Sequence, residues 1–138
     1  SNNQFLTDEK WEVKVDFKEH DQRELDQMGI TNYNVGEVYS INYTVEGIET
    51  QYEKSNFKSL VKIIKTVIDI LFDFIKNNLQ IKAIITIGAN RDKDKIFSQA
   101  DSSKTDLYKT IIMAQISKIG WNWKHINIIG LEGFLIYK

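Results

Sequence analysis

The chain has no cysteine, no proline and only two histidines in its 138 residues. The lack of cysteine excludes disulfide scaffolds, Cys/His zinc sites and cysteine nucleophiles. The lack of proline leaves every turn to glycine and polar residues. A chain of this length forms one domain and buries roughly two-thirds of the surface of its unfolded state, so it needs no covalent or metal cross-link. We therefore expect a single domain over residues 1–138 that is stabilised by an apolar core.

Long uncharged apolar runs are also missing. Residues 1–10 are polar, and the most apolar stretch, residues 60–75, carries Lys62, Lys65, Asp69 and Asp73. Charges at this density disfavour a bilayer span, and a polar start is not a secretion signal. We expect a cytoplasmic protein without membrane contact.

The two halves of the chain differ in charge, although the net charge is only −1. Residues 1–56 hold 12 acidic and 5 basic side chains, whereas residues 57–138 hold 7 acidic and 13 basic ones. We expect the halves to neutralise each other across the fold; the alternative is that they steer a charged partner to one face. The chain lacks the strong basic excess of a dedicated nucleic-acid-binding domain.

Alternating side chains predict strands in the first third of the chain. Residues 11–18 alternate between apolar and charged side chains without exception, and residues 39–46 alternate between apolar and polar ones. Gly47 suits a tight turn into a weaker third strand over 48–52. The acidic stretch 19–29 predicts a loop or a short helical turn.

A long helix is predicted over residues 57–76. Its charged side chains recur every three or four positions along one narrow stripe, and apolar side chains fill most other positions. Such a helix has to lie across a sheet; a second helix or another subunit is the further cover that the pattern allows. Ser55 or Asn56 caps its start, and Asn77-Asn78 ends it. The stripe consists of Lys58, Lys62, Lys65, Asp69, Asp73 and Lys76.

The remainder predicts a central strand, a second helix and two further strands. Residues 81–87 are apolar on both faces, as in a central strand. Ser103 and Asp106 resemble a capping box at the start of a helix that Gly120 ends. Strands over 121–129 and 134–137 follow, separated by a turn over 130–133. The order β-β-β-α-β-α-β-β predicts an α+β fold with a mixed, largely antiparallel sheet and two main helices.

Residues 57–121 resemble a set of small phage and bacterial proteins of unassigned activity. The shared features are an apolar helix ending in Asp73-Phe74-Ile75, an apolar strand, a polar loop, and Leu107-Tyr108 opening a helix that ends in Gly120-Trp121. The resemblance covers about half of the chain and implies a phage or mobile-element setting.

The element order is also similar to that of the acyl-CoA N-acetyltransferases (GNAT-like) without their first two helices. In that family a long central strand leads into a helix whose N-terminus holds the cofactor pyrophosphate, with glycines that let the backbone come close. Leu107-Tyr108 and Gly120-Trp121 resemble the family's tyrosine-bearing helix and the step into its next strand. Residues 52–59, which match the phosphate segment, include no glycine and no arginine. On this departure we expect no cofactor.

No catalytic or metal-binding constellation is apparent. Asp92 and Asp94 alternate with basic residues that compete with a cation, and residues 19–24 have no second histidine at ligand spacing. Neither a Gly-x-Ser-x-Gly elbow nor a glycine-rich phosphate loop is present. We expect no catalytic residue and no metal.

The candidate ligand-binding residues are Arg91, Lys104, Tyr108, Trp121 and Trp123. The two tryptophans share one strand face, with lysine on the opposite face, and suit stacking on a base or a ligand ring; the alternative is that they cover the end of the long helix. Tyr108 follows a basic loop and suits presentation of its hydroxyl to a ligand, or packing at the edge of the core.

The complete core without reactive groups favours a non-enzymatic interaction or accessory domain. The partner is another protein or a second copy of the chain, because one sheet face does not fully cover the apolar helix 57–76. A diverged acyl-CoA N-acetyltransferase and a single-stranded nucleic-acid-binding domain are the alternatives.

Overall fold

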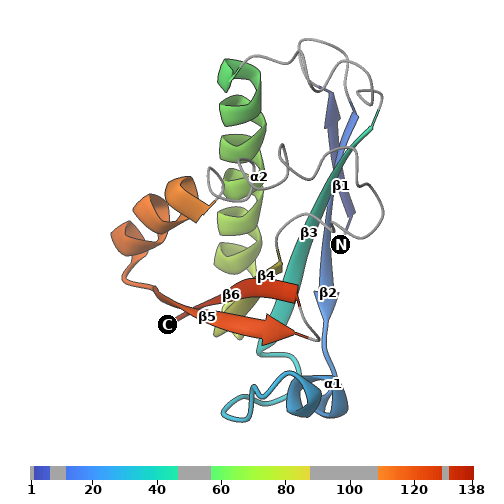
Figure 1. Cartoon of the computed structure of the whole chain (residues 1–138), viewed down its shortest axis with the longest axis vertical. Helices are drawn as coiled ribbons and strands as arrows, with labels where there is room; N and C mark the ends of the chain where they lie inside the picture. Colours follow the sequence, from blue (N-terminus) through green and yellow to red (C-terminus); the bar gives the residue numbers. More distant parts are fainter. Residues whose placement is uncertain (1, 7–11, 47–56, 88–108, 129–130) are drawn as a thin grey trace.

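Six strands form one mixed sheet in the order β1-β2-β3-β4-β6-β5 (Figure 1). The computed structural model describes residues 2–6, 12–46, 57–87, 109–128 and 131–138. The pair β3/β4 is parallel, and all other neighbouring strands are antiparallel. The predicted α+β class is thus confirmed. The elements are β1 (Asn2–Leu6), β2 (Glu12–Glu19), α1 (Gln22–Gln27), β3 (Val38–Glu46), α2 (Phe57–Asn77), β4 (Ala83–Ile87), η4 (Ser117–Ile119), β5 (Asn122–Ile128) and β6 (Leu131–Tyr137), and residues 109–116 are helical up to η4.

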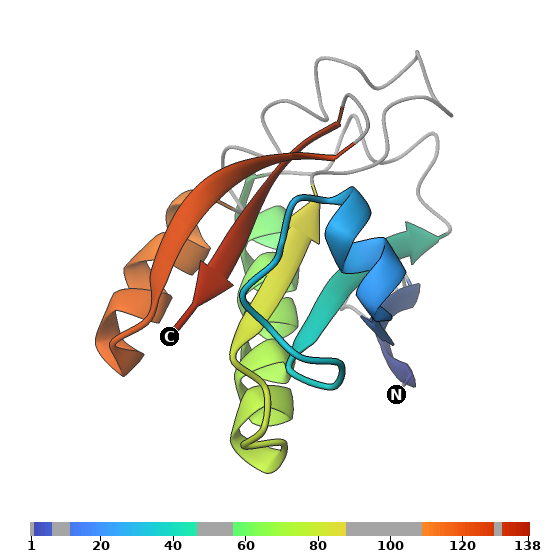
Figure 2. The same cartoon turned by 90° about the horizontal axis from the view of Figure 1, so that it is seen from below.

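The two faces of the sheet carry cores of unequal size. On one face, α2 and the helix 109–116 pack on alternate residues of β2, β3, β4 and β6. On the other face, α1 and the segment that follows it cover a smaller cluster (Figure 2). The central strand β4 contributes to both cores, because Ile84 belongs to the larger and Ala83 and Ile85 to the smaller. This confirms a central strand over 81–87.

The long helix α2 is buried as its pattern predicts. Six of its side chains belong to the larger core, and Phe74 stacks on Phe17 of β2 with ring centroids 3.9 Å apart. The described charged side chains of its stripe are exposed. No large apolar side chain is exposed in the described part of α2, residues 61–77. The apolar side chains over 61–77 are therefore buried or half-buried within one chain, and self-association through this helix stays a prediction.

Two details differ from the sequence prediction, and a third decides between two predicted alternatives. Strand β1 was not predicted, because most of its residues are polar and the backbone of β2 holds it at the sheet edge. The predicted turn over 130–133 is wrong from Leu131 onwards, since Gly133 lies inside β6 between Ile87 and Ile126. The acidic stretch 19–29 contains a short helix, α1, as the second of its two alternatives predicted.

Other predictions are confirmed or lie outside the described residues. Gly120 ends the second helix with a φ of 75°, the left-handed conformation for which glycine was expected. Asn78 closes α2 by donating its Nδ2–H to the Phe74 carbonyl at 2.7 Å. The predicted turn at Gly47, the strand over 48–52 and the helix start at 103–106 lie outside the described residues.

Shortening a side chain of α2 that packs in the larger core tests the burial of this helix. Leu71 is fully buried, so Leu71→Ala should lower the free energy of unfolding by about 2–5 kcal/mol. The exposed neighbour Asp69 provides the control, and Asp69→Ala should change it by less than about 0.5 kcal/mol. Urea denaturation of both variants measures the difference; equal effects would contradict the burial of this helix.

Candidate functional site

The structure describes two of the five predicted ligand-binding residues and separates their roles. Trp121 is 7% exposed and belongs to the larger core with Ile112 and Ile116, so it covers the apolar helices. Trp123 is 38% exposed on β5. Arg91, Lys104 and Tyr108 lie outside the described residues. The pair Asp92 and Asp94 does so too, and no cluster of metal-ligating side chains is present in the described ranges.

Trp123 forms a cluster with Lys109 and His125. The Lys109 Nζ lies 5.1 Å from the centre of the indole and 3.2 Å from His125 Nε2. The imidazole meets the indole edge to face, with ring centroids 5.2 Å apart. An ammonium group only donates hydrogen bonds, so His125 Nε2 accepts and its proton resides on Nδ1. Lysine and imidazole together hold the indole in one orientation.

A second polar group links α1 to the sheet through His20. Its Nε2 lies 2.9 Å from Ser40 Oγ and its Nδ1 lies 3.2 Å from Glu24 Oε2. A carboxylate only accepts, so Nδ1 donates to Glu24; in the neutral ring, Nε2 then accepts the hydroxyl proton of Ser40. Serine, histidine and acid thus stand in the order that nucleophilic catalysis uses.

The burial of Ser40 argues against a catalytic role for its hydroxyl group. Ser40 and His20 are 3% and 6% exposed, beneath the layer that α1 forms. A substrate carbonyl cannot reach the hydroxyl without removing that layer, so the group anchors α1. Sequence reasoning considered His20 and Glu24 as metal-capable groups, and the two histidines also as possible members of a triad with a serine. It missed Ser40, which lies twenty positions away on β3 and carries no local signal.

Glu24 in α1 and Glu37 just before β3 have lowered pKa values. The pKa of Glu24 lies below its ordinary value of 4.5, chiefly because its carboxylate accepts the backbone N–H of Asp21 at the start of α1, and then because of His20. The pKa of Glu37 is lowered chiefly by the Lys82 ammonium, 2.8 Å away. This ion pair joins the segment before β3 to the segment before β4.

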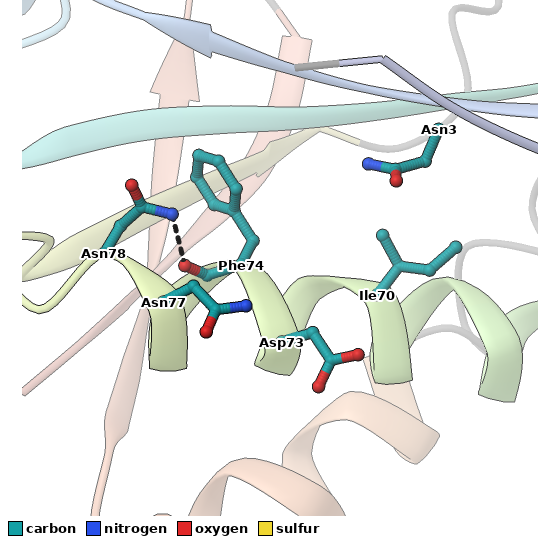
Figure 3. Close-up of a pocket in the computed structure, with 6 residues that line it drawn as sticks. All are labelled: Asn3, Ile70, Asp73, Phe74, Asn77 and Asn78. Carbon is teal, nitrogen blue, oxygen red and sulfur yellow. Dashed lines mark hydrogen bonds between the residues drawn. The ribbon is translucent and has the colours of Figure 1, made fainter.

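A groove of about 320 Å³ lies between β1 and the end of α2 (Figure 3). Asn3 faces the helix across it, and Ile70 and Phe74 lie among the polar groups of α2. The groove offers hydrogen bonds but no nucleophile and no histidine among its lining residues. Its polar lining comprises Asn3, Asp73, Asn77 and Asn78.

The parallel strands β3 and β4 are paired over the first part of β3. Their register runs from Val38↔Ala83 to Ile41↔Thr86, and β4 ends one residue later, at Ile87. Strand β3 stays paired with β2 as far as Glu46. Within the described residues, β3 therefore extends past the carboxyl end of β4 from Asn42 to Glu46.

The buried serine allows a test of the anchor. Ser40→Ala removes the donor to His20 Nε2 in a buried site, so it should lower the free energy of unfolding by about 1–3 kcal/mol. Ser117 is exposed and provides the matched control. Ser117→Ala should lower the free energy of unfolding by less than about 0.5 kcal/mol. Labelling of Ser40 by a fluorophosphonate would instead show a reactive nucleophile and contradict the anchoring role.

Glu24 also predicts a pH dependence. Because its folded pKa is below the unfolded value, its contribution to stability is present above about pH 4.5 and is lost as the pH falls through the folded pKa. Glu24→Gln keeps a side-chain acceptor for Asp21 but does not titrate. Thermal melts between roughly pH 6 and pH 3 should show a smaller fall in melting temperature for the variant than for the wild-type chain. Parallel plots of melting temperature against pH would contradict this assignment.

Comparison with known proteins gives no assignment. No protein-family model, no curated protein and no solved structure matches this chain. None of the described helices has the length and apolar character needed to cross a bilayer. Function is therefore argued from the geometry above.

Proposed function

We propose that this chain is a diverged acyl-CoA N-acetyltransferase that binds an acyl-CoA along the part of β3 that extends past the carboxyl end of β4. The strand order supports this proposal, since it contains one parallel pair at its centre, joined through α2. Strand β3 is nine residues long and leads towards α2, as a long central strand does in the family that the element order resembles.

The end of the β3/β4 register is the observation that carries the proposal. Within the described residues, β4 ends at Ile87, and β3 continues to Glu46 with β2 as its paired strand. Backbone groups along such an extension can pair with an extended ligand, as in strand addition to a sheet edge. The pantetheine arm of coenzyme A is an extended chain with amide groups, so it has the required chemistry.

The predicted site residues favour the same end of the sheet. Ligands of sheets with parallel strands gather outside the carboxyl ends of those strands. Arg91, Lys104 and Tyr108 all follow the carboxyl end of β4 in the sequence. Since residues 52–59 lack glycine and arginine, we assign the phosphate contacts to the basic residues of 88–108.

The interaction domain predicted from the sequence is the competing proposal. It was based on a complete core without a catalytic constellation, and the apolar surface of α2 suggested self-association in addition. Within one chain, the sheet and the helix 109–116 pack on that surface. An accessory domain of phage type without a small-molecule ligand predicts no heat on titration with acetyl-CoA. The two proposals are thereby separable in one measurement.

Calorimetric titration with acetyl-CoA tests the proposal, and hydrogen exchange locates the ligand. We expect heat of binding and slower exchange of the backbone amides of β3 after Ile41. The double variant Arg91→Ala/Lys104→Ala should bind at least about tenfold more weakly, because it removes charge-assisted hydrogen bonds. Lys65→Ala/Lys76→Ala removes equal charge from the stripe of α2 and should bind normally. Absence of heat, or protection confined to β5, would refute the proposal.

A further inference from the structure

The exposed indole of Trp123 has one face that its two partners leave open. Lys109 Nζ and His125 Nε2 are only 3.2 Å apart, and both groups contact the ring. Atoms on opposite faces of a ring are separated by about 7 Å, which is twice a van der Waals contact distance. Lysine and imidazole therefore lie on the same side of the indole. Neither of them covers its second face, and the side chain is 38% exposed.

The segment of the chain that contains this indole is basic. Residues 109–138 contain four lysines and a single acidic residue, Glu132. Lys109 and His125 stand beside the ring, and Lys124 lies on the opposite face of β5, with its Nζ 5.7 Å from the centre of the Tyr137 ring. A negatively charged polymer that crosses β5 thus meets cationic groups on both faces of the strand.

The position of β5 suits an elongated ligand. It is the last strand of the sheet and pairs with β6 alone among the described strands. A small ligand binds best in a concave pocket, whereas a polymer gains affinity from several weak contacts on an open surface. An aromatic platform flanked by lysines on an open edge has the chemistry that binds unpaired bases and their phosphates.

We propose that the Trp123 platform, formed by Trp123, Lys109, His125 and Lys124, binds single-stranded nucleic acid. One base stacks on the open face of the indole, and the neighbouring phosphates contact the lysines. The orientation of the indole is set in advance, because Lys109 and His125 already hold it. This site is separate from the acyl-CoA site proposed along β3, since β4 and β6 lie between β3 and β5 in the sheet.

Fluorescence anisotropy of a labelled oligothymidylate on the full chain tests the proposal at low salt. Trp123→Ala should weaken binding by about 5- to 150-fold, the range for loss of one stacked base. Trp123→Leu keeps apolar volume and should weaken binding similarly, which separates stacking from folding. Lys109→Ala should lower the slope of log affinity against log salt by about 0.7, the value for one phosphate on a single strand. Lys65→Ala on α2 is the matched control and should leave affinity and slope unchanged.

The remaining outcomes overturn the proposal. These are an absence of binding to the wild-type chain at low salt, equal losses in Lys65→Ala and Lys109→Ala, and equal competition by duplex DNA or by free thymidine nucleotide. Titration of acetyl-CoA into Trp123→Ala separates this proposal from the preceding one. Unchanged heat in that titration, together with lost oligonucleotide binding, identifies two independent sites.

Discussion

The burial of α2 is the constraint on which the rest of the structure depends. A helix of 21 residues with a single charged stripe cannot remain in water, so it needs apolar cover on most sides. The sheet provides that cover on one side, and the helix 109–116 adds to it. Because α2 connects β3 to β4 across one face, the two strands have to be parallel neighbours, with antiparallel strands added on either side. Ile64 and Leu71, fully buried, show how completely this requirement is met.

The same connection determines where ligands can be placed. Two parallel strands bring their carboxyl ends to one edge of the sheet, and β3 extends past the described end of β4 at that edge. The antiparallel pair β5/β6 completes the sheet on the far side and leaves β5 as its boundary. The two proposed sites lie at these two places. The extension of β3 suits an extended small molecule, and the basic aromatic boundary at β5 suits a polymer.

Side-chain periodicity predicted the helices and strands that have one buried face. It could not predict contacts between residues that are distant in the sequence. The alternation of residues 11–18 and the stripe of α2 are local patterns, and both led to correct elements. Strand β1 is held by backbone pairing with β2, which its polar residues do not reveal. Gly133 suggested a turn, but it lies in a strand where Ile87 and Ile126 flank it. Of the candidate sites, Trp123 was predicted, whereas the contact of His20 with Ser40 depends on a strand pairing that no spacing encodes.

The unequal cores have a consequence for how the molecule opens. The larger core joins α2 to four strands, whereas six buried apolar side chains of the described residues form the smaller one. The layer of α1 is attached through that small cluster and through the Ser40–His20 hydrogen bond. Loosening this layer would leave α2 packed on its own face of the sheet. We therefore expect the α1 layer to open locally at a lower free energy than the larger core does.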